Sequence, residues 1–191
     1  MVRTISLVLA LLVAVPATSD AEWTLKPFGG VIFGSSHGFV DLDDAAGRVQ
    51  PTFGGAGGWD WAKLGVEVEL ATAPKFLKGA SGLVESGRLD TFFANVNWRL
   101  RPLGSRLQPY VAFGVGAARV TLDDVLDAFT STTTLVAGNI GGGVIATTPM
   151  RVRVIGDVRY VRSQFRDVGP AGLGEEHVAY WRATGGVLIR F

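Results

Sequence analysis

Apolar and polar residues alternate with a period of two in several parts of the chain. In the clearest segment, 63–71, one face would carry Leu64, Val66, Val68 and Leu70. Glu67 and Glu69 fall on the opposite face, because alternate side chains of a β-strand point to opposite sides. The same alternation recurs in 90–100, 109–119 and 151–161. Each of these segments is therefore a predicted β-strand with one apolar face.

Weaker alternation predicts four more strands, at about 23–34, 49–59, 133–147 and 178–191. The expected connections alternate between short (60–63, 101–107, 147–149) and long (35–48, 74–87, 121–132, 162–177). Residues 122–129 could form a short helical turn inside one of the long loops. Short turns at one end and long loops at the other are typical of transmembrane β-barrels. The even strand number then puts both chain ends on the side of the short turns.

The polar face of the predicted strands carries charged side chains that favour a closed barrel interior. They are Glu67, Glu69, Arg99, Arg153, Asp157, Arg159 and Arg182. Arginine is the cation best suited to buried pairing with carboxylates, so we expect an internal ion-pair network rather than a pair of catalytic carboxylates. The expected partners of the two glutamates are Arg99, Arg153 and Arg159.

Small residues share this polar face, as the narrow interior of an eight-stranded barrel requires. They are Gly65, Ala71, Ala112, Gly114, Gly116, Ala118 and Gly186. The apolar face would then point outward, toward lipid. Its interface aromatics are Trp59 and Trp98 beside short turns, and Tyr160 and Trp181 beside long loops, as in the aromatic girdles of membrane barrels. Arg119 lies on the apolar face near a long loop and is expected to reach lipid phosphate.

The first residues of the chain predict export. Arg3 is followed by an apolar stretch at 5–15 and by small residues before Glu22, the pattern of a secretory signal peptide. That stretch is too short for a membrane-spanning helix, which needs about 20 residues. We therefore expect a signal peptide at 1–21 and a single barrel domain at 22–191.

Composition excludes several functions. The chain has 18 Lys and Arg against 17 Asp and Glu, a net charge of +1 that gives no case for nucleic-acid binding. It has no cysteine, so disulfide and thiol chemistry are absent. His37 and His177 fall in predicted long loops with several acidic residues, namely Asp41, Asp43, Asp44, Glu175 and Glu176, which leaves a surface divalent-cation site open. We nevertheless predict no metal and no cofactor, because a solvated acidic loop that bridges lipopolysaccharide counterions non-specifically accounts for these residues. We also predict no catalytic residue, because Ser36 and His37 would lie in a loop rather than on a strand.

The stretches 108–117 (QPYVAFGVGA) and 185–191 (GGVLIRF) make the sequence resemble the small OmpA/OmpX-type outer-membrane β-barrels of Gram-negative bacteria. The resemblance implies an eight-stranded, antiparallel, up-and-down transmembrane β-barrel. It also implies that Val187, Ile189 and Phe191 form an assembly signal read by the outer-membrane insertion machinery, after periplasmic chaperones have delivered the chain. The implied surroundings are outer-membrane lipid and lipopolysaccharide, and we expect a monomer.

The expected function is a structural or surface-interaction role carried by four extracellular loops on a barrel scaffold. Two alternatives remain, a narrow channel through the charged interior and a lipid A-modifying enzyme. The alternative fold is a secreted, lipocalin-like carrier with its apolar face inward.

Overall fold

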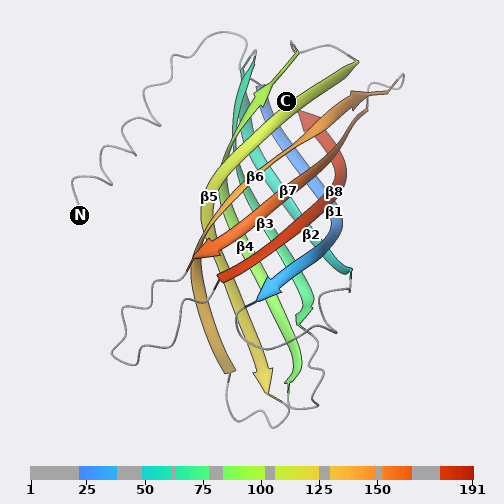
Figure 1. Ribbon diagram of the computed structural model, residues 1–191. Coiled ribbons are helices and arrows are strands. Elements are labelled where there is room, and N and C mark those ends of the chain that lie inside the picture. The colour runs from blue at the N-terminus through green and yellow to red at the C-terminus, as the bar shows by residue number, and fades with distance from the viewer. Residues whose placement is uncertain are drawn as a thin grey trace, which may run out of the picture.

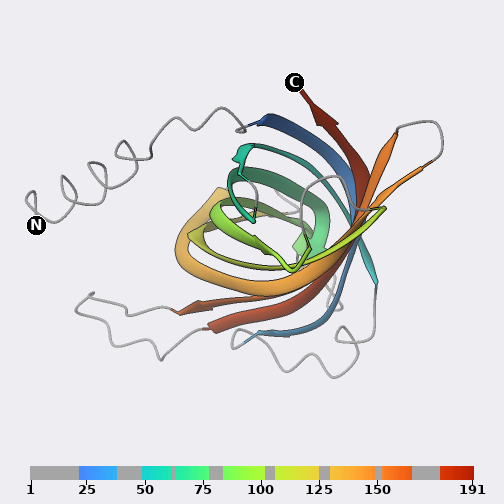
Figure 2. The same ribbon diagram turned by 90° about the horizontal axis from the view of Figure 1, so that it is seen from above.

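Eight β-strands close into one antiparallel barrel, and each strand pairs with its neighbours in chain order (Figures 1 and 2). The computed structural model describes residues 22–37, 49–61, 63–77, 84–101, 106–124, 130–148, 152–164 and 177–191. The strands are β1 (Glu22–His37), β2 (Gln50–Asp60), β3 (Leu64–Leu77), β4 (Val84–Arg99), β5 (Leu107–Asp124), β6 (Thr130–Thr147), β7 (Arg153–Gln164) and β8 (His177–Arg190). The predicted all-β, eight-stranded antiparallel barrel is confirmed. No helix in the described ranges is long and apolar enough to cross a membrane.

The strands are strongly tilted, as their pairing shows. Following paired residues from Trp23 on β1 through all eight strands leads back to β1 at Phe33, 10 residues further along. With about 3.3 Å per residue and about 4.8 Å between strands, this offset corresponds to a tilt of about 40° from the barrel axis. About ten residues then cover roughly 25 Å along the axis, the height of the apolar band of a transmembrane barrel.

The two ends of the barrel differ. At the turn end lie the connections 61–63, 100–106 and 148–152, together with the start of β1 and the end of β8. The barrel closes there, since the Phe191 backbone N–H donates to the Trp23 carbonyl oxygen at 3.0 Å. At the loop end, β4, β5 and β6 extend beyond β1 and β8 (Figure 1).

The long strands correct several predicted boundaries at the loop end. Leu122–Asp124 belongs to β5 rather than to a helical turn, and residues 125–129 lie outside the described part of the chain. Asp123 pairs with Thr130 on β6. The threonine-rich start of β6 is therefore part of a β-strand, although it shows no apolar alternation. Many residues that were predicted to lie in long loops belong to β3, β4, β5 or β6. The difference in length between the short and the long connections is therefore smaller than predicted.

The outward face of the barrel is an apolar belt. Exposed apolar residues on this face include Trp23, Leu25, Phe53, Val68, Leu70, Phe92, Trp98, Phe113, Val115, Ile140, Val158, Trp181 and Ile189. Near the turn end the rings of Trp23 and Trp59 lie 4.5 Å apart, and toward the loop end those of Tyr160 and Trp181 lie 5.1 Å apart. All the predicted interface aromatics are on this outward face. Val187, Ile189 and Phe191 also lie there, although their role as an assembly signal stays a prediction.

Candidate functional site

The inward side chains form four layers, and β7 shows their order. From the turn end its inward residues are Arg153, Ile155, Asp157, Arg159 and Val161. Arg153 belongs to a turn-end charged layer, made of Glu22, Asp60, Arg99, Arg153 and Arg190. Ile155 belongs to a turn-side apolar layer, made of Tyr110, Ala112, Ile145, Ile155 and Leu188.

The next two layers occupy the middle and the loop side of the barrel. Asp157 and Arg159 belong to a central charged layer, made of Lys26, Glu67, Glu69, Asp157, Arg159 and Arg182. Val161 belongs to a loop-side apolar layer, made of Ile32, Ala73, Phe76, Leu89, Phe93, Ala118, Leu135, Ala137, Val161, Val178 and Tyr180. The central charges are therefore enclosed between two apolar layers.

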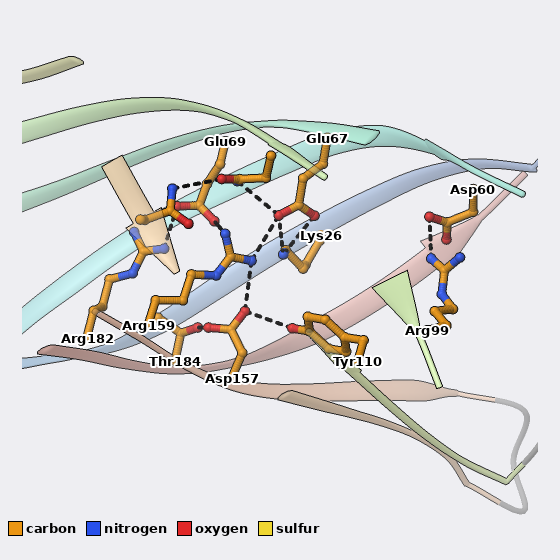
Figure 3. A network of polar contacts seen from close by, with 12 residues as sticks. Lys26, Asp60, Glu67, Glu69, Arg99, Tyr110, Asp157, Arg159, Arg182 and Thr184 are labelled. Atoms are coloured by element: carbon orange, nitrogen blue, oxygen red, sulfur yellow. Dashed lines mark hydrogen bonds and ion pairs between the residues drawn. The ribbon is translucent and has the colours of Figure 1, made fainter. Parts of the chain in front are cut away.

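Arg159 is the hub of the central charged layer (Figure 3). Its guanidinium lies 2.9 Å from a carboxylate oxygen of Glu67, 3.3 Å from one of Glu69 and 3.0 Å from one of Asp157. The side chain is fully buried. A buried arginine is tolerated only when carboxylates compensate its charge, and here it touches all the acids of the layer.

The remaining charges of the central layer are also paired. Lys26 donates to both carboxylate oxygens of Glu67, at 3.1 and 3.0 Å, and Arg182 pairs with Glu69. Asp157 accepts hydrogen bonds of 2.8 Å from the Tyr110 hydroxyl and of 2.8 Å from the Thr184 hydroxyl. Three carboxylates thus face three cations, and the layer is electrically neutral.

Side-chain amides extend this layer across the barrel. The Asn95 amide donates to Glu67 at 3.2 Å, and the Asn139 amide donates to Asn95 at 2.8 Å. Glycines leave the space for these side chains. A Cβ atom on Gly143 would lie 2.6 Å from Asp157 Cβ, and one on Gly141 would lie 2.8 Å from Arg159 Cγ. The large and small inward residues therefore complement each other, as an eight-stranded barrel requires.

The turn-end charged layer pairs two of the predicted network residues differently from the prediction. Arg99 pairs with Asp60 and also donates to the Trp61 carbonyl oxygen at 3.2 Å. Arg153 lies 3.8 Å from Glu22. Neither arginine is paired with Glu67 or Glu69, so the predicted partners of the glutamates were wrong except for Arg159. The reason is position along the axis, because Arg99 and Arg153 lie at the turn ends of β4 and β7 while both glutamates lie in mid-barrel.

Sequence reasoning missed Glu22, Lys26, Asp60 and Arg190 as members of the charged layers, and it missed Tyr110 as a hydrogen-bond donor to Asp157. Lys26 sits on a weakly alternating strand, yet the outward Trp23 and Leu25 place it inward by parity. Asp60 was expected in a turn, but it is the last residue of β2. The alternation itself could have found both residues. Trp23 and Trp59 are outward, so residues an odd number of positions away on the same strand, such as Lys26 and Asp60, point inward.

Two small cavities lie between inward side chains of the described residues. A cavity of about 20 Å³, room for roughly one water molecule, lies among the turn-end layer, the turn-side apolar layer and Lys26 and Glu67 of the central layer. Another, lined by loop-side residues including Ile32, Leu89 and Tyr180, has no room for water. At these two places the described side chains therefore leave little free space.

The polarity of the wall reverses toward the loop end of β4 and β5. In mid-barrel the outward residues are apolar, but Arg88, Asp90 and Arg119 point outward further along. Arg88 and Asp90 form an exposed ion pair of 2.9 Å. The inward residues beside them, Leu89 and Ala118, are apolar and buried. This reversal marks where the wall passes from an apolar to an aqueous environment. Outward side chains are apolar where they contact lipid and polar where they contact water.

The candidate chemistry at the histidines is only partly within the described residues. His37 is the last residue of β1 and His177 is the first residue of β8. Both histidines are therefore strand residues, although the sequence analysis predicted them in loops. His37 pairs with Val178, which places the two histidines at neighbouring strand ends. The acidic residues 41, 43, 44, 175 and 176 lie outside the described part of the chain. Among the residues that are described, no group of three or more potential metal ligands occurs.

Solved structures share this architecture. Neisserial surface protein A matches with a TM-score of 0.67 and 14% identity, over 90% of this chain and 99% of its own. The N-terminal β-barrel domain of Pseudomonas aeruginosa OprF has a TM-score of 0.57 at 14% identity, over 90% of this chain and 98% of the domain. The outer membrane protein OprG of the same organism has a TM-score of 0.53 at 16% identity, over 90% and 96%.

The chain has the fold of the small outer-membrane β-barrels. The low identities mean that this likeness concerns architecture alone. No protein-family model matches the chain, and no curated protein matches its sequence. What distinguishes this barrel must therefore come from its own residues, above all the layered interior and the outward wall.

Proposed function

We propose that the protein is an integral outer-membrane barrel whose structural or surface-interaction role is carried by four extracellular loops. The observation that carries this proposal is the wall itself. Its outward face is apolar over about the height of a bilayer core and becomes polar at the loop end, as Arg88 and Asp90 show. A secreted carrier with an apolar lumen would need the opposite arrangement in mid-barrel, where the charges of this protein are inside.

The interior supports a scaffold rather than a channel. An ion crossing the barrel would meet the neutral central charged layer and then the loop-side apolar layer, where residues such as Phe93 and Leu89 are buried. Cavities beside these layers hold about one water molecule or none. We therefore propose that the protein conducts no ions and has no catalytic activity, and that it acts as a monomer surrounded by lipid and lipopolysaccharide.

Assembly follows from the same proposal. The insertion machinery would read Val187, Ile189 and Phe191 on the outward face of β8 after export through the periplasm. Pairing of β8 with β1 then leaves no unpaired strand edge in lipid, where such an edge would be costly.

Cell fractionation tests the location. The protein should require detergent for extraction from outer membranes and should migrate differently on a gel when boiled, because a closed barrel keeps its shape in detergent until heated. Recovery in the soluble periplasmic fraction would contradict the proposal. Planar-bilayer recordings of the purified barrel should show no discrete conductance steps, and lipid A from cells with and without the protein should have the same acyl pattern.

A further inference from the structure

The outward wall has a groove of about 530 Å³ across β5, β6 and β7. These three strands are neighbours in the barrel, as Figure 1 shows. Its outward lining residues are Val115, Val136, Gly138, Ile140, Tyr160 and Arg162. Gly138 is at its centre, paired with Val115 on one side and Arg162 on the other. The absence of a side chain at Gly138 leaves the centre of this groove open.

The apolar residues around Gly138 are unusually uncovered. Val115 and Val136 are 70% and 76% exposed, whereas Val154 and Val158, also outward, are 40% and 43% exposed. The interior does not require glycine here, since a Cβ on Gly138 would meet only the Gly114 carbonyl oxygen, at 3.8 Å. This contrasts with Gly141 and Gly143, where a Cβ would collide with the charged core. The groove is thus a feature of the outer surface, not a by-product of interior packing.

Arg162 gives one end of the groove a positive charge. It points outward two residues beyond Tyr160, toward the loop end, where the neighbouring Tyr160 and Trp181 rings pack together. Within the described residues Arg162 has no carboxylate partner, unlike outward Arg88, which pairs with Asp90. An apolar groove with a cation at its outer end matches a lipid that has an acyl chain below a phosphate.

We propose that this groove binds lipid A, with an acyl chain over Gly138 and a phosphate at Arg162. The proposal rests on the outer-membrane location proposed above, since the loop end then faces the leaflet that contains phosphorylated glycolipid. Tyr160 stands beside both parts of the groove and would contact the lipid where the chain meets the headgroup, a position that tyrosine favours.

The test is native mass spectrometry of the purified barrel in detergent micelles containing bisphosphorylated lipid A. Gly138→Leu fills the groove and should lower lipid A binding about tenfold, the effect of losing contact with one to two methylene groups. Arg162→Gln should lower it about fivefold and remove the preference over lipid A stripped of its phosphates.

Gly156→Leu is the matched control for the groove. Gly156 is also an outward glycine, and a Cβ there would meet only the Thr184 carbonyl oxygen, at 3.8 Å. Arg88→Gln is the control for charge, because that arginine is already paired. Both controls should bind lipid A like the unmodified protein, and the heat-dependent gel shift reports folding of every variant.

Two results would overturn the proposal: equal lipid A binding by the unmodified protein and a folded Gly138→Leu variant, or equal binding of phosphatidylglycerol and lipid A. Cell fractionation tests the proposed outer-membrane location separately. The micelle measurement needs only the folded barrel, so the two failures are distinguishable.

Discussion

The central charged layer and the turn-end charged layer contain similar residues in different surroundings. In the central layer Arg159 is fully buried and touches three carboxylates, and positive and negative charges balance. In the turn-end layer three arginines face two carboxylates, and Arg153 and Glu22 have side chains that are 23% and 44% exposed. Burial and number of partners, rather than residue type, should therefore decide what each arginine contributes to stability.

The largest effect is expected for Arg159→Met. Removing the hub leaves buried carboxylates without their cation, which should lower the free energy of unfolding by about 3–5 kcal/mol. Urea unfolding in phospholipid vesicles, followed by tryptophan fluorescence, measures this. The double variant Arg159→Met/Glu67→Gln restores neutrality to the layer and should recover part of the loss. No recovery would show that packing rather than charge makes Arg159 important.

Arg99→Met should have an intermediate effect, about 1.5–3 kcal/mol in the same unfolding experiment, because a charged hydrogen-bonded pair is lost. Asp60 would keep a second cation, since Arg190 lies 3.6 Å from it. This remaining partner is the reason for a smaller effect than at Arg159. A loss as large as that of Arg159→Met would mean that the turn-end layer is as essential as the central one.

Arg153→Met should change the free energy of unfolding by less than about 1 kcal/mol, as for other solvent-accessible ion pairs. Its only recorded ion pair among the described residues is with Glu22 at 3.8 Å, and Glu22 also contacts Arg190 at 3.1 Å. Added salt should leave the difference between Arg153→Met and the unmodified protein small. A loss above that of Arg99→Met would invert the comparison between the two layers.

Much of the barrel was predictable from alternation, because the direction of a side chain on a strand depends only on parity. Leu64, Val66 and Val68 were predicted on the outer face and are there, and Glu69 and Arg159 were predicted inside and are buried. Strand ends were less predictable. Residues 130–134 (TSTTT) pair with β5 although they show no apolar alternation, since above the apolar belt the outward face becomes polar.

The candidate site was predictable as a set of inward charges but not as a set of pairs. Glu67 and Glu69 were identified, yet Lys26 and Arg182 rather than Arg99 and Arg153 complete their neutralisation. Asp60 was hidden by its place next to a turn. The groove around Gly138 had no signal in the sequence, because a glycine on the outward face looks the same whether its neighbours leave a hollow or cover it.

The sequence by itself determined the strands, the face of each residue and the polarity of both faces, because these depend on neighbours two positions apart. Only the tertiary structure decided which inward residues meet. The offset of 10 residues around the barrel sets the height of each strand relative to the others. That height brings Arg159 on β7 to the glutamates of β3, leaves Arg99 with Asp60, and places Arg162 beside Gly138 at the outer edge of the belt.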